Sequence, residues 1–317
     1  MTAEVPGQPA EMPLSRWLDL GGPVHYVDYG GPAEGPLLVC IHGLGGSLVN
    51  WAAVAPTLSL TCRVLALDLA GFGRTRSQGR STSVTANQQL LHRFLTEMCQ
   101  EPAILVGNSM GGLISVLETV AHPETVAGLV LVDPAMPVGL GSRPDPLVAV
   151  VFGLYAVPAV GRSVVSRRRS SHSAEQQTLA LLRLCCADSS RIPQDVVERH
   201  IALARERDDY ADVDTELIVA ARSLMWVLAR RKVHAAMLRR IAVPVLLLHG
   251  DQDRLVPVAS ARAAAAANPT WRFEVARGVG HVPQLEVPEW TLDQILDWLE
   301  TDGAAAAYAA SPESRRI

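Results

Sequence analysis

One serine has the sequence surroundings that a catalytic nucleophile requires. Ser109 is the centre of the pentapeptide GNSMG, which follows the aliphatic run AILV and precedes a segment with helical spacing. Glycine two positions before and after the serine permits a sharp strand-to-helix turn that exposes the hydroxyl. The amide of Met110 then lies at a helix N-terminus and faces developing negative charge. We predict that Ser109 is a nucleophile and that the Met110 amide is an oxyanion donor.

A serine hydroxyl is a weak nucleophile near neutral pH and needs a general base. Of the nine histidines, His281 stands out because it lies in the loop GVGHVP, between a predicted strand and the last predicted helix. His25 and His249 fall within or at the end of strands, where a packed histidine is the simpler interpretation. We predict that His281 is the base.

The base in turn needs a carboxylate that orients it, and the sequence offers three candidates. Asp251 and Asp253 stand in the segment HGDQDR after the strand PVLLL, and Asp133 follows the strand LVLV. Asp133 also suits a helix cap or turn before Pro134. The residues alone leave the choice among these carboxylates open.

A second oxyanion donor is expected from another loop at the same edge of the sheet. The segment HGLGG, residues 42–46, follows the strand LLVCI, and its glycines allow the backbone amide of Leu44 to face the nucleophile. His42 is suited to shaping this loop. A phosphate-binding loop is the rival interpretation, but no Lys-Ser/Thr follows and no GxGxxG is formed, so we predict no nucleotide site.

The elements that position these residues alternate between short aliphatic runs and helical patterns, which predicts a doubly wound α/β sheet. Residues 1–136 and 241–300 are expected to form the two parts of one core domain. Residues 137–240 contain helical stretches and no convincing strand, so they predict a helical cap inserted into that core. Residues 301–317 lack amphipathic order and are expected to form a flexible tail.

Composition excludes several classes of protein. Hydrophobic residues make up 49% of the 317, which excludes a mostly disordered chain. The net charge of −4, without a long basic stripe, argues against nucleic acid as a main partner. The first 13 residues lack the basic start and apolar core of a secretory signal, and the five cysteines lack metal-ligand spacing. These features favour free thiols in a reducing cytoplasm.

One uncharged stretch, Leu147 to Gly161, raises the question of membrane contact. It is shorter than the roughly 18 to 20 residues expected of a spanning helix, contains Gly153 and Pro158, and is followed by several arginines. We predict a buried or pocket-lining helix, with a surface that touches lipid or a lipid-like substrate as the alternative. The side chains expected to line or roof the pocket are Val150, Val151, Leu154, Val157 and Val160.

Five motifs resemble those of the α/β-hydrolase superfamily and stand in the same order, spanning nearly the whole chain. They are HGLGG from His42, DLAGFGRT from Asp68, GNSMGG from Gly107, GDQDRLVP from Gly250 and GVGHVPQLEVPE from Gly278. The resemblance implies the α/β-hydrolase fold, a mostly parallel doubly wound sheet with a helical cap inserted after the sixth strand.

The resemblance also assigns roles to residues of this chain. It implies the catalytic order Ser109, Asp253, His281, so that Asp253 is the acid, Asp251 shapes the turn and Asp133 is the fallback acid. The backbone amides of Leu44 and Met110 take the oxyanion roles. No metal or organic cofactor is implied.

Within the superfamily, serine at position 109 argues against dehalogenases and epoxide hydrolases, which use aspartate there. The resemblance favours a simple carboxylic-ester hydrolase that uses a serine. The aliphatic composition of the predicted cap suggests that the ester has an apolar acyl or alcohol group. Hydrolases that cleave carbon–carbon bonds in ring-fission products are an alternative, although Val282 and the Leu44-Gly45-Gly46 loop depart from their pattern. Perhydrolase, amidase and thioesterase activities are further alternatives, and a non-catalytic ligand receptor on the same fold is one of another class.

Overall fold

The computed structural model describes residues 13–138 and 145–303. Eight strands form one sheet in the order β1-β2-β4-β3-β5-β6-β7-β8. The pairs β1–β2 and β2–β4 are antiparallel, and all other pairs are parallel. The strands are β1 (Ser15–Asp19), β2 (Pro23–Gly30), β3 (Leu37–Ile41), β4 (Arg63–Leu67), β5 (Ala103–Asn108), β6 (Val126–Val132), β7 (Val245–Gly250) and β8 (Arg272–Ala276).

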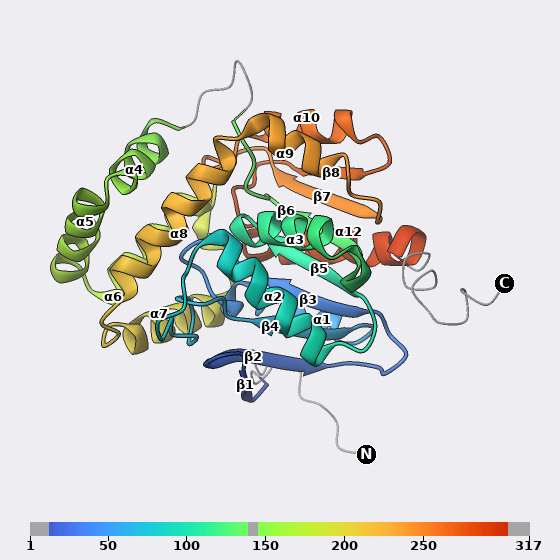
Figure 1. The fold of residues 1–317 in the computed structure, drawn as a ribbon, viewed down its shortest axis with the longest axis horizontal. Helices are drawn as coiled ribbons and strands as arrows, with labels where there is room; N and C mark the ends of the chain where they lie inside the picture. The colour runs from blue at the N-terminus through green and yellow to red at the C-terminus, as the bar shows by residue number, and fades with distance from the viewer. Residues whose placement is uncertain (1–12, 139–144, 304–317) are drawn as a thin grey trace.

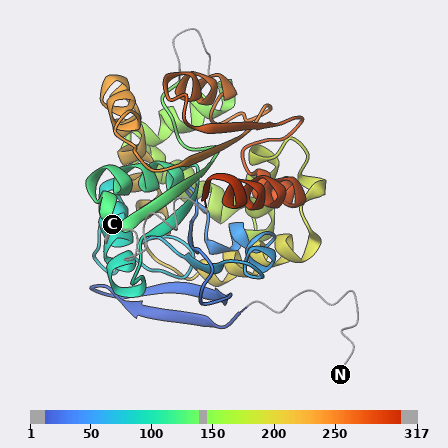
Figure 2. The same cartoon turned by 90° about the vertical axis from the view of Figure 1, so that its right-hand side faces the viewer.

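Helices cover both faces of this sheet, so its central strands are buried on both sides (Figures 1 and 2). One face packs against α2, α3, α9 and α10, and the other packs against η1, α1 and α12. Their bounds are η1 (Leu48–Trp51), α1 (Ala55–Leu58), α2 (Val84–Met98), α3 (Met110–Ala121), α9 (Arg231–Leu238), α10 (Val258–Ala267) and α12 (Pro288–Trp298), with the short turns η2 (Pro123–Thr125), α11 (Pro283–Glu286) and η4 (Leu299–Gly303) completing this part.

The run LLVCI in β3 shows why such strands read as continuously apolar. Val39 and Ile41 belong to the cluster on one face, whereas Leu38 and Cys40 belong to the cluster on the other. Successive side chains of a strand point to opposite faces, so a sheet covered on both sides needs no polar alternation. The predicted fold class is confirmed.

Two sequence-based boundaries differ from the structure. The strand β1 was not anticipated, because the segment SRWLD at this edge of the sheet is mostly exposed and carries no buried pattern. The predicted tail begins at residue 301, but Leu299–Gly303 forms a short helix, η4. The rest of that predicted tail, residues 304–317, lies outside the described residues.

Between β6 and β7 the described residues form helices only, in agreement with an insertion after the sixth strand. These are α4 (Pro146–Ala156), α5 (Pro158–Ser171), α6 (Ala174–Cys185), η3 (Ser189–Arg191), α7 (Gln194–Arg207) and α8 (Val213–Leu228), followed by α9. In Figure 1, α8 lies between the sheet and the pair α4–α5. The boundaries of the cap as a domain remain a prediction.

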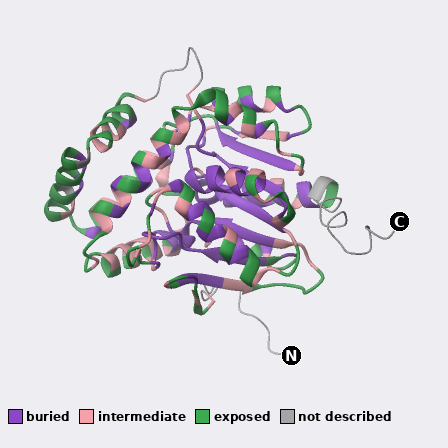
Figure 3. Ribbon diagram, in the orientation of Figure 1, coloured by how far each residue is buried: buried purple, intermediate pink, exposed green. Residues whose placement is uncertain are grey.

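The apolar stretch from Leu147 to Gly161 is neither one helix nor buried. It breaks between α4 and α5, and Val150, Val157 and Val160 are exposed, with Val150 at 59%. Figure 3 shows the same: most of this pair of helices is exposed. The prediction of a buried helix is therefore wrong, because the pair packs mainly against α8 and most of its described side chains remain exposed.

No single helix among the described residues is long and apolar enough to cross a membrane. The pair α4–α5 passes that test of length and composition only when its two helices, which are bent by 119°, are taken together.

Candidate active site

Ser109 occupies a strained turn between β5 and α3. Its φ is 54° and its ψ is −118°, a conformation that non-glycine residues rarely adopt. A Cβ at Gly107 would lie 2.7 Å from the backbone of Gly111 and Gly112, and one at Gly111 would lie 2.3 Å from the Ile41 carbonyl oxygen. The predicted requirement for glycine on both sides of the serine therefore has a direct steric cause.

His281 and Asp253 are joined side chain to side chain. The distance from His281 Nδ1 to Asp253 Oδ2 is 2.7 Å, and both residues are buried. The other carboxylate oxygen of Asp253 accepts hydrogen bonds from the amides of Leu255 and Val256, at 2.7 and 3.0 Å. Both oxygens of the carboxylate are thus held in place. Because Nδ1 of His281 is bonded to Asp253, its Nε2 is the ring nitrogen available to a substrate.

The two other candidate acids have different partners. Asp251 accepts a hydrogen bond from the Gly278 amide at 2.7 Å and so fastens the loop that carries His281, as expected of a turn-shaping residue. Asp133 is fully buried with a φ of 43°, and its Oδ1 accepts from the Gly250 amide at 2.9 Å. Its Oδ2 has no hydrogen-bond partner.

Electrostatics separate Asp133 from Asp253. Burial, followed by the negative charge of Asp253, raises the pKa of Asp133 well above its usual range, which disfavours its charged form. Burial also opposes ionisation of Asp253, but the charge and hydrogen bond of His281 outweigh it and lower its pKa. Of the two neighbouring carboxyl groups, Asp253 is the one whose surroundings favour the charged form that orients a histidine.

The loop HGLGG lies directly against the serine. A Cβ at Gly43 would lie 3.0 Å from the Cβ of Ser109, so a side chain at this position would crowd the serine. His42 holds the loop, since its Nδ1 lies 2.8 Å from the Gly43 carbonyl and its Nε2 accepts from the Leu69 amide at 3.0 Å. Burial lowers the pKa of His42, which keeps it neutral for both contacts.

Two backbone amides are available near the serine. Met110 is the first residue of α3, so its N–H has no partner within the helix. The amide of Leu44 donates no hydrogen bond to any described residue. The Ser109 hydroxyl likewise has no hydrogen-bond partner within the part of the chain that the structure describes, so the serine and the histidine are not joined as the histidine and the aspartate are.

Two positioning contacts were not anticipated from the sequence. The Asn108 side chain donates to the carbonyls of Val132 (3.0 Å) and His281 (3.1 Å), and so ties the serine turn to the histidine loop. The fully buried Glu286 carboxylate accepts hydrogen bonds from three backbone amides, those of Ala187 (3.1 Å), Asp188 (2.9 Å) and Gly280 (2.9 Å). The sequence signal available for Glu286 is its position in the motif GVGHVPQLEVPE, shortly after His281.

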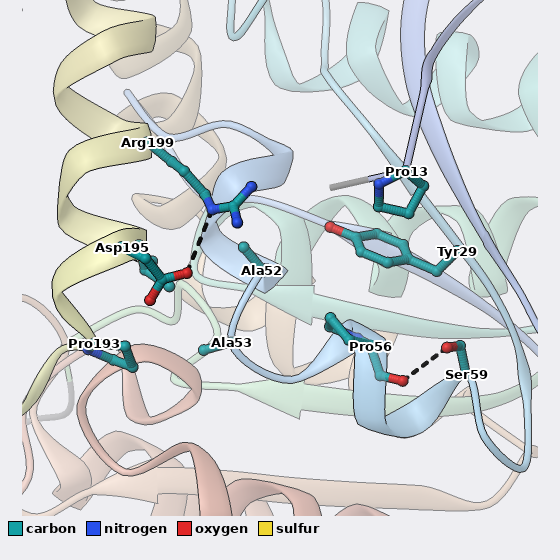
Figure 4. Close-up of a pocket in the computed structure, with 10 residues that line it drawn as sticks. Pro13, Tyr29, Ala52, Ala53, Pro56, Ser59, Pro193, Asp195 and Arg199 are labelled. Carbon is teal, nitrogen blue, oxygen red and sulfur yellow. Dashed lines mark hydrogen bonds and ion pairs between the residues drawn. The ribbon is translucent and has the colours of Figure 1, made fainter. Parts of the chain in front are cut away.

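A pocket of about 290 Å³ lies away from these residues (Figure 4). Tyr29 lines it on one side and α7 on the other, where Asp195 and Arg199 form an ion pair. None of its lining residues is Ser109, Asp253 or His281. We therefore assign the site from its side chains rather than from this pocket.

Two clusters of described residues bring potential metal ligands within 4.8 Å of one another. In the first, Asp133, Asp253 and His281, the atoms Asp253 Oδ2 and His281 Nδ1 already bond to each other. In the second, the Glu118 carboxylate already bonds to His92, and the His92 and His122 rings stack at 3.7 Å. Both clusters are thus explained by contacts within the protein.

Comparison with known proteins finds similarity to several hydrolases. The chain is 25% identical to the human monoacylglycerol lipase ABHD6, over 87% of this chain and 81% of the relative. It is also 25% identical to a 2-hydroxy-6-oxo-6-(2'-aminophenyl)hexa-2,4-dienoic acid hydrolase of Metapseudomonas resinovorans, over 90% and 91%. A thermophilic esterase from Thermogutta terrifontis has a similar fold, with a TM-score of 0.68 and 21% identity over 90% of this chain and 98% of the esterase.

The sequence profile of the alpha/beta hydrolase fold family matches residues 36–288, which include the serine turn, the glycine loop and the histidine loop. The chain therefore belongs to the α/β hydrolase fold family.

Proposed function

We propose that this hydrolase is a serine esterase that cleaves carboxylic esters with an apolar acyl or alcohol group through an acyl-enzyme. The observation that carries the proposal is the 2.7 Å pair between His281 and Asp253, held on a loop that Asn108 ties to the strained Ser109 turn. A lipase among the relatives supports the ester substrate.

In the first half of the reaction, His281 Nε2 accepts the proton of the Ser109 hydroxyl while the serine oxygen bonds to the ester carbonyl carbon. The negative charge that develops on the carbonyl oxygen is stabilised by the amides of Leu44 and Met110. Asp253, which is ionised, fixes the tautomer of His281 and stabilises the imidazolium.

The tetrahedral intermediate then collapses. The carbon–oxygen bond to the alcohol breaks, the alcohol takes the proton from His281, and the acyl group remains on Ser109. In the second half, His281 accepts a proton from water as the water oxygen attacks the acyl carbon. The acid leaves and the serine regains its proton, so no cofactor is needed for the cycle.

Carbon–carbon bond hydrolysis is the second candidate, and the similarity to the Metapseudomonas resinovorans dienoic acid hydrolase favours it. The two candidates share Ser109 and His281 and differ in the bond that breaks. A panel of p-nitrophenyl esters from acetate to laurate, measured beside a ring-fission dienoate, separates them. We expect ester turnover that rises from acetate to medium chains; turnover of the dienoate alone would replace the esterase proposal.

The nucleophile is tested by Ser109→Ala, with Ser115→Ala as the matched control. Ser115 is a buried serine in α3 whose hydroxyl donates to the Gly111 carbonyl. We expect Ser109→Ala to fold normally and to lower kcat/KM by at least about 10³-fold, because the covalent step is lost. Ser115→Ala should keep most of the activity.

A fluorophosphonate probe distinguishes an esterase from a receptor on the same fold. Labelling that depends on Ser109, together with steady-state ester turnover, is the expected result. Labelling without turnover across the whole ester panel would favour the non-catalytic receptor, and wild-type turnover in Ser109→Ala would exclude the proposed mechanism.

A further inference from the structure

The α4–α5 pair carries several aliphatic side chains that face solvent. The exposed members are Leu147, Val150, Val157, Val160 and Val164, and Val157 is 52% exposed. A single exposed valine needs no explanation, but a group on one pair of helices marks an interaction surface. We call this group, with the exposed arginines described next, the hairpin surface.

The charge of the same segment is one-sided. Residues 146–171 contain four arginines and no aspartate or glutamate, whereas the whole chain has a net charge of −4. The side chains of Arg162 and Arg167 are exposed, and neither forms an ion pair with another described residue. Arg169 is instead held by Asp214 at 2.9 Å. The hairpin surface is therefore both apolar and positively charged.

The hairpin surface is connected to the proposed active site through one helix. A Cβ at Gly161 of α5 would lie 2.8 Å from Ile218 of α8, so the two helices approach closely there. On the same helix, the Leu217 side chain would lie 3.8 Å from a Cβ placed at Gly45, within the glycine loop that flanks Ser109. A molecule bound at the hairpin surface would thus lie one helix away from the serine.

We propose that the hairpin surface docks onto a lipid bilayer that contains anionic phospholipids. Aliphatic side chains next to arginines suit the boundary between acyl chains and phosphate groups, because each part then meets its preferred environment. The bend of 119° and the arginines of α5 favour helices that lie in the interface over helices that cross it. A second copy of this chain is a poorer partner, since two hairpin surfaces would bring like charges together.

Docking at this surface does not depend on the esterase proposal. That the enzyme draws a lipid ester from the bilayer into its site does rest on the proposed function. The experiment therefore measures binding and hydrolysis separately.

Binding is measured by co-sedimentation of the full chain with vesicles of phosphatidylcholine alone, or of phosphatidylcholine and phosphatidylserine in equal amounts. Two double variants remove the two properties of the surface: Val150→Ser with Val157→Ser, and Arg162→Gln with Arg167→Gln. Their controls are Leu60→Ser with Val233→Ser, which are exposed elsewhere, and Arg231→Gln with Arg239→Gln, which change the net charge equally.

We expect the wild type to bind the anionic vesicles. Either hairpin variant, or high salt, should weaken this binding more than about tenfold, and the control variants should preserve it. Unchanged thermal unfolding of the variants shows that they fold. Absence of binding to anionic vesicles, or equal losses in the controls, would overturn the proposal. A wild-type dimer by light scattering that the hairpin variants convert to monomer would also overturn it, because the surface would then be an interface between copies.

Hydrolysis of a soluble p-nitrophenyl ester completes the design. Arg162→Gln with Arg167→Gln should keep its wild-type kcat/KM in solution, and Ser109→Ala should bind vesicles as the wild type does. If no ester is cleaved but binding follows the hairpin surface, the proposed function fails and the docking surface stands. If esters are cleaved but no vesicle is bound, the docking proposal fails and the proposed function stands.

Discussion

Two parts of the helical insertion, which we call the α6–η3–α7 end and the α4–α5 end, are held in different ways. The α6–η3–α7 end is fastened to the histidine loop, where the His281 amide donates to the Cys185 carbonyl at 2.6 Å and Glu286 binds the chain just after α6. The α4–α5 end packs mainly on α8 and leaves aliphatic side chains in solvent. The first end thus helps to set the geometry of the site, while the second is free to serve as a surface.

The physical difference lies in what is buried. A buried carboxylate is costly unless its hydrogen bonds are made, and Glu286 has its three amide donors in place. An apolar seam accompanies it, in which Val196 and Leu182 of the insertion pack with Val282 and Leu285 beside His281. No comparable buried link holds α4–α5 among the described residues, so changes at the two ends should have unequal effects.

The largest contrast is expected from Glu286→Gln. The amide side chain removes the negative charge and turns a donor towards backbone N–H groups, which should cost about 2–4 kcal/mol of unfolding free energy. We also expect kcat/KM on a soluble ester to fall by about 10–100-fold, because the loop that carries His281 shifts. Denaturant unfolding and ester kinetics measure both effects.

Glu289→Gln is the matched control, since Glu289 is exposed in the first turn of α12. Its unfolding free energy should lie within about 0.5 kcal/mol of that of the wild type, and its kcat/KM should be close to the wild-type value. A Glu286→Gln protein with the same stability and kinetics as this control would show that the carboxylate does not hold the insertion to the histidine loop.

A smaller contrast is expected from the same substitution at each end. Val196→Ala in the buried seam should cost about 2 kcal/mol, because it removes two methyl groups and leaves a cavity. Val150→Ala on the exposed side of α4 should change stability by less than about 0.5 kcal/mol, since alanine favours the helix and no packing is lost. Chemical denaturation measures the unfolding free energy of both variants. Equal losses of unfolding free energy would show that the two ends are not held differently.

Acid should lower the stability of the protein through a histidine of the fastened end. Burial lowers the pKa of His200 in α7 to about 4, and its Nε2 has no hydrogen-bond partner. Between the ordinary histidine pKa of about 6.5 and this value, the unfolded chain binds a proton that the folded chain does not, so stability falls as pH falls. At pH 5 the loss from this group is about 1–2 kcal/mol.

His200→Gln should therefore reduce the drop in unfolding free energy between pH 7 and pH 5. Burial also lowers the pKa of His234 in α9 to about 4, so His234→Gln gives the same test outside the fastened end. If the pH dependence of His200→Gln matches that of the wild type, then protonation of His200 does not contribute to acid unfolding.

The sequence predicted the strands of the core and singled out Ser109 and His281 as candidates, because these carry short-range signals, whereas Asp253 was chosen only through the resemblance to a known family. The GNSMG turn, the glycine loop and the aliphatic strands each contain their own steric or burial pattern. Glu286 could not be assigned a role in the same way, since its partners include backbone amides about 100 positions away and any residue type can supply an amide. The exposure of α4 was missed because an apolar run predicts burial but does not say what covers it.

The smallest effect is expected from the ion pair between Arg74 and Glu206, which also joins the fastened end to the core. The pair spans 2.9 Å, but both side chains are about 40% exposed, so water and salt screen it. A double-mutant cycle with Arg74→Gln and Glu206→Gln should give a coupling of about 0.5 kcal/mol or less that disappears at high salt. A salt-resistant coupling as large as the effect of Glu286→Gln would mean that surface charge, and not the buried carboxylate and its seam, holds the insertion in place.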